Sequence, residues 1–111
     1  MQYLLLIYDN EAEYEKVRET EYPQWIEYSR RIQEAGILLG GNELKPGRTA
    51  TTVRGKNVEL SDGPFMETKE VLGGYFHIEV EHLDVALDWA RQMPHVSRGG
   101  AVEVRPVQDD G

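Results

Sequence analysis

The segment from Asp62 to Glu70 contains most of the residues in this chain that could do chemistry. Asp62 precedes a Gly-Pro pair and the bulky Phe65, and Lys69 follows shortly after. A carboxylate beside a rigid proline and an apolar anchor is typical of a loop that carries a site, where partial burial would suit Asp62 to general acid or base catalysis with Lys69 as its electrostatic partner. Turn chemistry explains the same residues, with Phe65 in the core and the charged side chains in solvent. The spacing alone leaves both interpretations open.

Histidines are the other acid–base candidates, and the chain has His77, His82 and His95. None of their spacings matches the HxH or HExxH patterns that place two imidazoles on one metal ion, so we expect no metal site. We predict that His77 or His95 pairs with Asp62 as the catalytic acid–base pair. The alternative for His77 is a solvent-exposed imidazole, and His95 is expected in a loop after Pro94 that could reach the end of the sheet.

A substrate anion would need a cation, and Arg105 in the last predicted strand could hold a carboxylate through two hydrogen bonds. An arginine in a terminal strand pairs more often with a glutamate of the same sheet, so both roles stay open. Tyr8, Phe65 and Tyr75 are the candidates for pocket walls, and Lys69 is a further candidate for substrate binding. No serine lies in a Gly-x-Ser-x-Gly elbow, and no glycine pair matches a phosphate or dinucleotide motif, so we expect no cofactor.

Composition limits the classes of function. The chain has 111 residues, 40% of them hydrophobic, which fits one folded domain at residues 1–108 followed by an acidic tail at 109–111. The absence of cysteine excludes disulfides, thiol nucleophiles and cysteine-based metal sites. A net charge of −8 with scattered basic residues argues against direct nucleic-acid binding. The longest apolar run, at residues 2–8, is too short to span a membrane, so we expect a cytoplasmic protein without a membrane partner.

Hydrophobic periodicity predicts alternating strands and helices. Residues 2–8 are predicted as a central strand and residues 11–19 as a weak helix that breaks before Pro23, because proline disfavours helical geometry in the residue before it. A stronger helix is predicted at residues 23–35. The remaining predicted elements are a strand at 37–39, a hairpin of 49–54 and 57–60, an irregular loop at 61–74, a strand at 75–80, a helix at 83–90 and a strand at 101–107.

This order gives two βαβ-like halves joined by an inserted β-hairpin. It is typical of a ferredoxin-like α+β fold, with one sheet and both helices on one of its faces. The helix-free face would then hold more apolar and aromatic side chains than one helical layer can cover. We therefore predict a homodimer in which two such faces meet and the segment after residue 61 folds over the resulting cleft.

Several stretches of the chain resemble one known family. They are Asp62-Gly63-Pro64-Phe65 with Glu67-Thr68-Lys69-Glu70, then Leu72-Gly73-Gly74-Tyr75, the Leu-Asp-x-Ala-Leu-x-Trp-Ala run at 83–90, and Glu103 to Val107. Together they resemble the DGPF-domain branch of the YCII-related (YciI-like) family. The resemblance implies a small bacterial protein with a ferredoxin-like, dimeric α/β-barrel fold, similar to muconolactone isomerase. It implies little about the reaction.

The enzymatic role proposed for the family depends on a His–Asp pair in the YciI-type branch, whose histidine lies in the first helix. The predicted helix at 23–35 has no histidine, so this pair is not carried over. The DGPF branch is also linked with sigma factors of the extracytoplasmic-function class. Two functions therefore stay open. One is a proton-transfer enzyme of isomerase or lyase type that acts on a small anionic metabolite, and the other is a non-catalytic ligand-binding or regulatory module linked to sigma-factor-dependent transcription.

Overall fold

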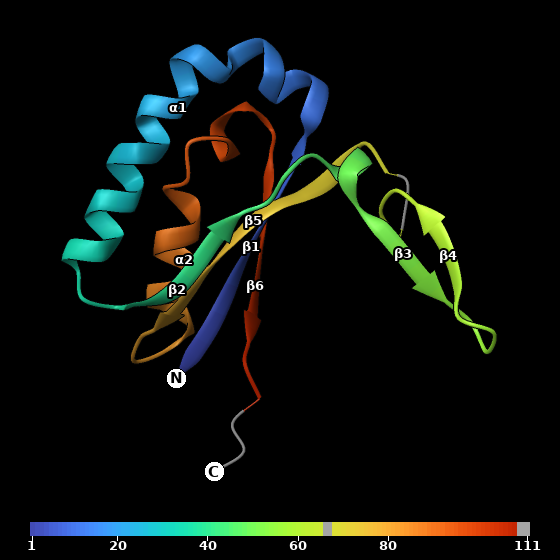
Figure 1. The fold of residues 1–111 in the computed structure, drawn as a ribbon. Helices are drawn as coiled ribbons and strands as arrows, with labels where there is room; N and C mark the ends of the chain where they lie inside the picture. Colours follow the sequence, from blue (N-terminus) through green and yellow to red (C-terminus); the bar gives the residue numbers. More distant parts are fainter. Residues whose placement is uncertain (66–67, 109–111) are drawn as a thin grey trace.

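The computed structural model describes residues 1–65 and 68–108. Met66 and Glu67 of the predicted loop, and the predicted acidic tail at 109–111, lie outside the described residues. Figure 1 shows the elements in the order β1 (Gln2–Asn10), α1 (Glu11–Glu34), β2 (Leu38–Glu43), the short 3-10 helix η1 (Gly47–Thr49), β3 (Thr51–Arg54), β4 (Glu59–Asp62), β5 (Glu70–Glu79), α2 (Leu83–Arg91), a second 3-10 helix η2 (Val96–Arg98) and β6 (Ala101–Pro106).

Strands β2, β5, β1 and β6 lie side by side in that order and form one sheet with antiparallel neighbours. The central position predicted for residues 2–8 is confirmed, because β1 lies between β5 and β6. Both helices lie on the same side of this sheet (Figure 1). The predicted ferredoxin-like α+β fold is therefore confirmed.

The hydrophobic core lies between the helices and one face of the sheet. Alternation along β1 directs Tyr3 and Leu5 to this face, and Ile78 of β5 lies opposite Tyr3. The other core residues come mainly from the helices and from the segments next to them, namely Tyr28, Ile32, Val80, Ala86 and Met93. The Tyr28 hydroxyl also donates a 2.7 Å hydrogen bond to the carbonyl of Trp89, which ties α1 to α2.

The predicted break before Pro23 is wrong, because α1 is one helix with Pro23 inside it. Proline has no N–H to donate within the helix and its ring crowds the preceding turn, so the helix bends in its middle (Figure 1). The side-chain amide of Gln24 donates a 3.3 Å hydrogen bond to the Thr20 carbonyl in the bent turn. Because of the bend, the first half of α1 reaches η2 through Glu21 while the second half packs on the sheet.

The predicted loop at 61–74 is too long, because β5 begins at Glu70 rather than at residue 75. Gly73 is the extra residue of a bulge, since Ile7 pairs with Gly74 while Tyr8 pairs with Leu72. A Cβ on Gly74 would lie 2.8 Å from the carbonyl oxygen of Asn42, so β2 and β5 approach closely only without a side chain there. The glycines that suggest a loop in the sequence therefore lie inside a strand.

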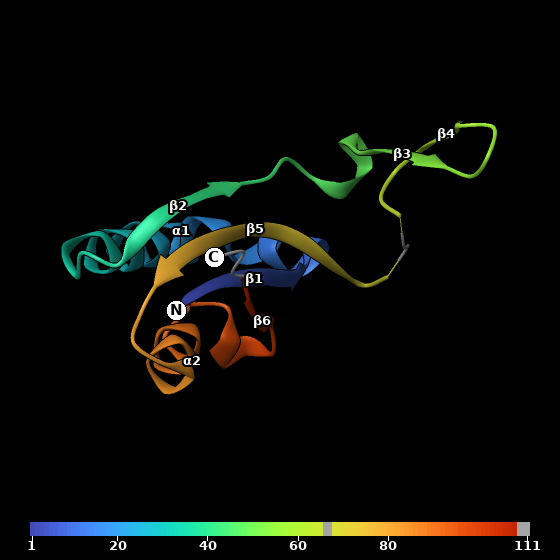
Figure 2. The same ribbon diagram turned by 90° about the horizontal axis from the view of Figure 1, so that it is seen from below.

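The predicted hairpin is confirmed: β3 and β4 pair as a separate two-stranded sheet. We refer to residues 51–62 as the arm. Figures 1 and 2 show that the arm projects beyond the four-stranded sheet. The radius of gyration is 15.4 Å, whereas a compact domain of this size has about 13 Å. The projecting arm accounts for this excess.

Candidate functional site

Three rows of side chains cross the sheet on the face that neither helix covers. The pairing registers place them as His77–Leu4–Arg105, Tyr75–Leu6–Glu103 and Leu72–Tyr8–Ala101, one row after another along the strands. We refer to this surface as the open face. Neighbouring strands lie about 4.8 Å apart, so the Cα atoms of His77 and Arg105 lie about 10 Å apart across Leu4. One small molecule could therefore contact both side chains.

His77 is held by a neighbour on the open face. Its Nε2 atom lies 2.9 Å from the Oε1 atom of Gln2, which belongs to the adjacent strand. An amide oxygen only accepts hydrogen bonds, so Nε2 carries the proton in this contact and Nδ1 keeps a lone pair. The neutral imidazole is thus in the tautomer that can take up a proton through Nδ1.

Tyr75 lies two residues before His77 on the same face of β5. The side-chain amide of Asn42 donates a 3.1 Å hydrogen bond to the Tyr75 hydroxyl oxygen. Because this oxygen acts as the acceptor, the hydroxyl proton stays available for a bond to a ligand oxygen. A donor and a proton acceptor therefore lie side by side along β5.

Arg105 supplies the positive charge of the open face. Its guanidinium pairs with Glu103 at 2.5 Å, and both side chains are exposed to solvent, 67% and 42% respectively. The expectation that this arginine pairs with a glutamate of the sheet is confirmed. An exposed ion pair of this kind contributes at most about 1 kcal/mol, so a ligand carboxylate could replace Glu103 at little cost.

Between the polar groups the open face is apolar or lacks a side chain. Leu4, Leu6 and Tyr8 are half-buried and form the floor between the polar groups. Gly40 lies opposite His77 on β2, and a Cβ at this position would meet no heavy atom within 4 Å. The absence of a side chain at Gly40 leaves one side of the imidazole open.

The other predicted site residues do not belong to the rows of the open face. Asp62 is the exposed last residue of β4 in the arm, and Phe65 is 67% exposed with its ring 4.5 Å from the guanidinium of Arg54. Lys69 is exposed just before β5. Within one chain Asp62 lies in the separate two-stranded sheet, and among the described residues no hydrogen bond or ion pair joins it to His77 or His95, so their pairing stays a prediction.

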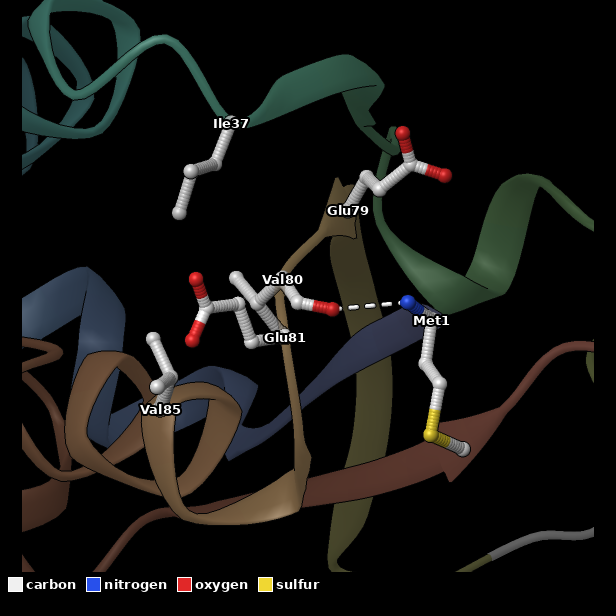
Figure 3. A pocket seen from close by; sticks show the side chains of 6 residues that line it. All are labelled: Met1, Ile37, Glu79, Val80, Glu81 and Val85. Carbon is white, nitrogen blue, oxygen red and sulfur yellow. Dashed lines mark hydrogen bonds between the residues drawn. The ribbon is translucent and has the colours of Figure 1, made fainter.

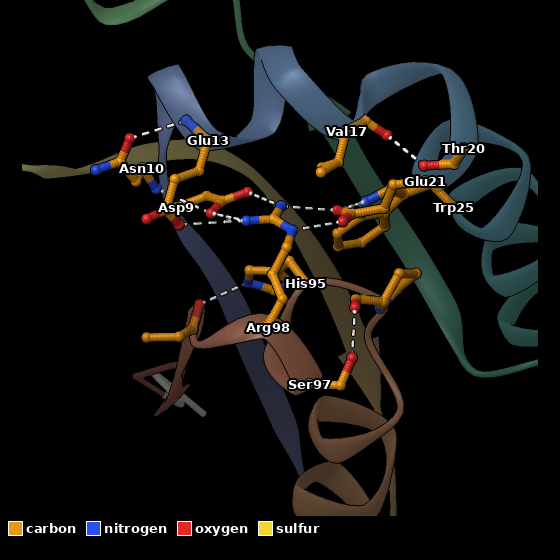
Figure 4. Close-up of polar contacts among 12 residues, drawn as sticks. Asp9, Asn10, Glu13, Val17, Thr20, Glu21, Trp25, His95, Ser97 and Arg98 are labelled. Atoms are coloured by element: carbon orange, nitrogen blue, oxygen red, sulfur yellow. Dashed lines mark hydrogen bonds and ion pairs between the residues drawn. The ribbon is translucent and has the colours of Figure 1, made fainter.

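His95 lies on the helix side of the sheet, in the cluster of Figure 4. It is fully buried, its ring centroid lies 5.2 Å from that of Trp25, and its Nε2 donates a 2.9 Å hydrogen bond to the carbonyl of Ala101. A Cβ on Gly100 would come within 2.3 Å of the imidazole. His95 does lie in the connection between α2 and β6, as predicted, but it is buried there instead of reaching towards the end of the sheet. Its packing gives it a structural role, and it has no route to the open face.

The same cluster holds a network of ion pairs that the sequence analysis missed. Arg98 contacts Asp9 at 2.6 Å and Glu21 at 2.6 Å, and Trp25 donates a 3.0 Å hydrogen bond to Glu21 (Figure 4). Burial alone would raise the pKa of Glu21, but the hydrogen bonds from Arg98 and Trp25 hold it below the ordinary value. The contacts with Glu21 and then Asp9 raise the pKa of Arg98. This network fixes η2 to β1 and to the middle of α1.

Sequence reasoning also missed Gln2 and Asn42, the residues that orient His77 and Tyr75. Gln2 precedes the alternating Leu4 and Leu6, so its side of the strand could be inferred from the period of two. Its partner could not, because cross-strand neighbours depend on the pairing register. Asp9 and Arg98 are far apart in sequence, and no motif connects them.

Two hollows of the described residues lie elsewhere. Figure 3 shows an open, mainly apolar pocket of about 470 Å³ at the end of the sheet, lined by Met1, Ile37, Glu79, Val80, Glu81 and Val85. In it the terminal ammonium group of Met1 donates a 2.7 Å hydrogen bond to the carbonyl of Val80. A second hollow of about 380 Å³ lies between the helices beside Tyr28. Neither contains a histidine, so the open face remains the better candidate site.

Two further kinds of site, a metal site and a membrane span, concern the described residues. Within residues 1–65 and 68–108, no group of three or more Asp, Glu or His side chains is placed to hold a metal ion. No helix in the same ranges has the length and apolar character needed to cross a membrane.

Comparison with known proteins identifies the family. The model of the YCII-related domain matches residues 1–109. The chain belongs to the YCII-related family. An uncharacterized protein of Rhizobium meliloti (strain 1021) is 42% identical over 81 residues, which cover 70% of this chain and 65% of that protein, slightly less than two thirds of its length.

A solved structure of another protein has a similar fold. It is 5-chloro-2-hydroxyhydroquinone dehydrochlorinase (TftG) from Burkholderia phenoliruptrix AC1100, in complex with 2,5-dihydroxybenzoquinone. The TM-score is 0.61, the sequence identity is 17%, and the match covers 97% of this chain and 94% of that one. At this level of identity the similarity is evidence of the fold alone.

Proposed function

We propose that this protein is a homodimeric proton-transfer enzyme, of isomerase or lyase type, that acts on a small anionic or enolic metabolite at the open face. One observation carries the proposal: His77, Tyr75 and Arg105 share one uncovered face, with the Nδ1 lone pair and the Tyr75 hydroxyl proton both available. A base, a hydrogen-bond donor and a cation around an apolar floor are what the removal of a proton next to a carbonyl requires.

The three groups take separate roles in this proposal. Nδ1 of His77 accepts a proton from a substrate carbon next to a carbonyl or enol. The Tyr75 hydroxyl donates a hydrogen bond to the oxygen on which the negative charge develops. Arg105 binds an anionic group of the substrate in place of Glu103. The proton then returns to another carbon in an isomerisation, or the bond to a leaving group breaks in an elimination.

The fold comparison suggests a first probe. The dehydrochlorinase is solved with 2,5-dihydroxybenzoquinone, a small ring compound with acidic hydroxyl groups and two ring C–H bonds between oxygen-bearing carbons. Such a compound is flat enough to lie on Leu4 between His77 and Arg105, and it is negative enough for Arg105. We propose small cyclic enols and keto acids as the substrate class.

Proton transfer can be tested before the natural substrate is known. The protein is incubated in D₂O with 2,5-dihydroxybenzoquinone or pyruvate, and loss of the C–H signal is followed by proton NMR. We expect the wild-type protein to accelerate the exchange of at least one probe. His77→Gln should lower the acceleration by about 10²–10⁴-fold, the usual contribution of a general base. His82→Gln is the matched control, because His82 precedes α2 outside the rows of the open face.

Two results would count against the proposal. Equal exchange rates for wild type and His77→Gln would remove the acid–base role of His77. Saturable binding of a probe without any accelerated exchange would favour the alternative, a ligand-binding or regulatory module. Sedimentation at micromolar concentration tests the homodimer separately.

A further inference from the structure

We infer that the arm of each protomer docks on the open face of a second copy of the chain, and that Asp62 thereby enters the site built around the partner's His77. The catalytic role of this site rests on the proposed function, but the position of the arm does not. The inference follows from four properties: the two faces of the arm, its lack of packing on the core of its own chain, the charge of the segment that carries it, and its length.

The two faces of the arm differ in chemistry. Cross-strand pairing joins Thr51 to Asp62 and Val53 to Leu60, so these four side chains lie on one face of the ribbon. Val53 is 60% and Leu60 is 70% exposed. This face, which we call the apolar arm face, therefore presents Asp62 next to two uncovered aliphatic side chains.

The arm does not pack on the hydrophobic core of its own chain. None of the described residues between 39 and 75 belongs to the core or packs against it as a partly buried neighbour. An isolated two-stranded hairpin is at best marginally stable in water. The contacts that order the arm and bury Val53 and Leu60 must therefore come from another molecule.

Charge indicates that this molecule is a second copy. The arm itself has two basic and two acidic residues, but the segment that carries it, residues 45–65, contains four basic and two acidic residues, whereas the rest of the chain contains eight basic and eighteen acidic residues. This basic segment is attracted to an acidic body and repelled by a second basic segment. The body of an identical chain is such a partner, and beside the row of His77 and Arg105 its open face offers the apolar side chains of Leu6 and Tyr8.

The dimensions agree with this arrangement. Residues 51–55 extend about 17 Å from the body at about 3.3 Å per residue. The four strands of the open face span about 15 Å at a spacing of about 4.8 Å. An arm laid across the face therefore reaches from one edge of the partner's sheet to the other.

Docking of the apolar arm face explains the position of Asp62. Within one chain Asp62 is exposed and separate from both histidines. On the partner's open face, its carboxylate would stand over the row that contains His77 and Arg105. Each site would then be completed by two chains, one supplying the base on the sheet and the other the carboxylate on the arm.

Cysteine cross-linking tests the position of the arm, because the natural chain has no cysteine. Leu60→Cys and Glu103→Cys chains are co-expressed with tags of different length, purified as dimers and treated with a short bismaleimide. We expect the mixed 60–103 product to dominate. The matched control replaces Glu103→Cys with Ile26→Cys, because Ile26 is 57% exposed on α1, on the opposite side of the sheet. Its mixed product should be at least about 10-fold weaker.

Three results would overturn the inference: equal yields of the two mixed products, single chains only in sedimentation, or an internal cross-link in a Leu60→Cys/Glu103→Cys double variant without a covalent dimer. The last result would place the arm on its own face. Failure of the proposed function would be seen separately. It would appear as the absence of His77-dependent proton exchange, whatever the yield of the cross-link.

Complementation then tests Asp62 in the partner's site. Asp62→Asn and His77→Gln chains are co-expressed, and the proton-exchange rate of the mixture is compared with that of each variant alone. Random pairing makes about half of the dimers mixed, and each mixed dimer keeps one intact site, so about a quarter of the wild-type rate should return. No recovery would show that Asp62 and His77 do not act across the dimer.

Discussion

Gly40 controls access to His77 from one side of the open face. It lies opposite His77, and a Cβ there would meet no heavy atom within 4 Å, so a larger side chain would enter the site without a backbone clash. We expect Gly40→Leu to weaken binding of 2,5-dihydroxybenzoquinone by at least about 10-fold, because the isobutyl group fills the space beside the imidazole.

Calorimetric titration measures this effect, and Gly40→Ala is the graded control. One methyl group should change the affinity little and should stabilise the fold by about 0.4–1 kcal/mol through the unfolded chain. Equal affinities for Gly40→Leu and wild type would show that the ligand site is not beside His77.

Glu21 makes the stability of the protein depend on pH. Its pKa in the folded protein is below the ordinary value, so its contribution to stability is complete above that value, near 4.5, and is lost as the pH falls through the lowered pKa. Glu21→Gln removes this charge from the Arg98 network. At about pH 7 the variant should be less stable by about 1.5–3 kcal/mol, the usual value of a hydrogen bond to a charged group.

Urea unfolding of both proteins across the acid range measures this difference, which should shrink as the pH falls. Glu27→Gln is the control, because Glu27 pairs with Arg30 in solvent on the outer side of α1. A difference between wild type and Glu21→Gln that stays constant with pH would contradict the assignment.

Single residues were predictable where a regular period fixes their side of a strand. Tyr8, Tyr75 and Arg105 share the open face with His77, because alternation places every second residue on one side. The partners of these residues were not predictable, since Gln2 and Asn42 come from other strands. The burial of His95 beneath Trp25 was hidden as well, because it depends on how α1 bends over η2.

Elements were predicted well except where proline or glycine occurs inside one. Pro23 lies within α1 because Glu21, before it, and Tyr28, after it, are both held by tertiary contacts. Gly73 and Gly74 lie within β5 because a bulge and a close strand approach need residues without side chains. In each case tertiary packing outweighs the local preference on which sequence prediction depends.

The arm is the element whose removal should leave the fold intact. The N–H of Gly63 donates a 2.6 Å hydrogen bond to the carbonyl of Ala50, so the two ends of the arm are adjacent. A Gly-Gly link in place of residues 51–62 should therefore close without distorting either end. Because the arm adds nothing to the core, we expect the unfolding free energy of the monomer to change by less than about 1 kcal/mol.

Urea denaturation followed by circular dichroism measures the stability of the armless chain, and sedimentation measures its oligomeric state. The same chain should be monomeric at concentrations where the wild type is dimeric. An armless chain that unfolds would show that the arm is part of the folding unit, and one that still forms dimers would contradict the docking of the arm.

At the scale of the whole molecule, the sequence predicts a dimer from an apolar excess on the helix-free face. The single chain is flat, with principal extents of 44, 43 and 19 Å, because only one side of its sheet is covered. The uneven distribution of charge between residues 45–65 and the rest of the chain adds a second property to this prediction. It makes self-association depend on salt, which burial of apolar surface alone would not do.

Charge reversal in the arm isolates this electrostatic contribution. Arg54 and Lys56 belong to the basic segment, and their replacement in Arg54→Glu/Lys56→Glu would turn attraction to the acidic body of the partner into repulsion. We expect the dissociation constant of the dimer to rise at least about 10-fold at low ionic strength. For the wild type, raising NaCl from about 0.05 M to about 0.5 M should weaken the dimer in the same direction, because salt screens exposed charges.

Sedimentation at several protein concentrations measures both effects. Lys16→Glu/Arg18→Glu is the matched control, since it makes the same change in net charge on exposed positions of α1. If net charge alone governed association, this control would weaken the dimer as much as the arm variant does. If the arm docks as inferred, the arm variant weakens the dimer far more, and its association becomes nearly independent of salt because the attraction that salt screens has been removed.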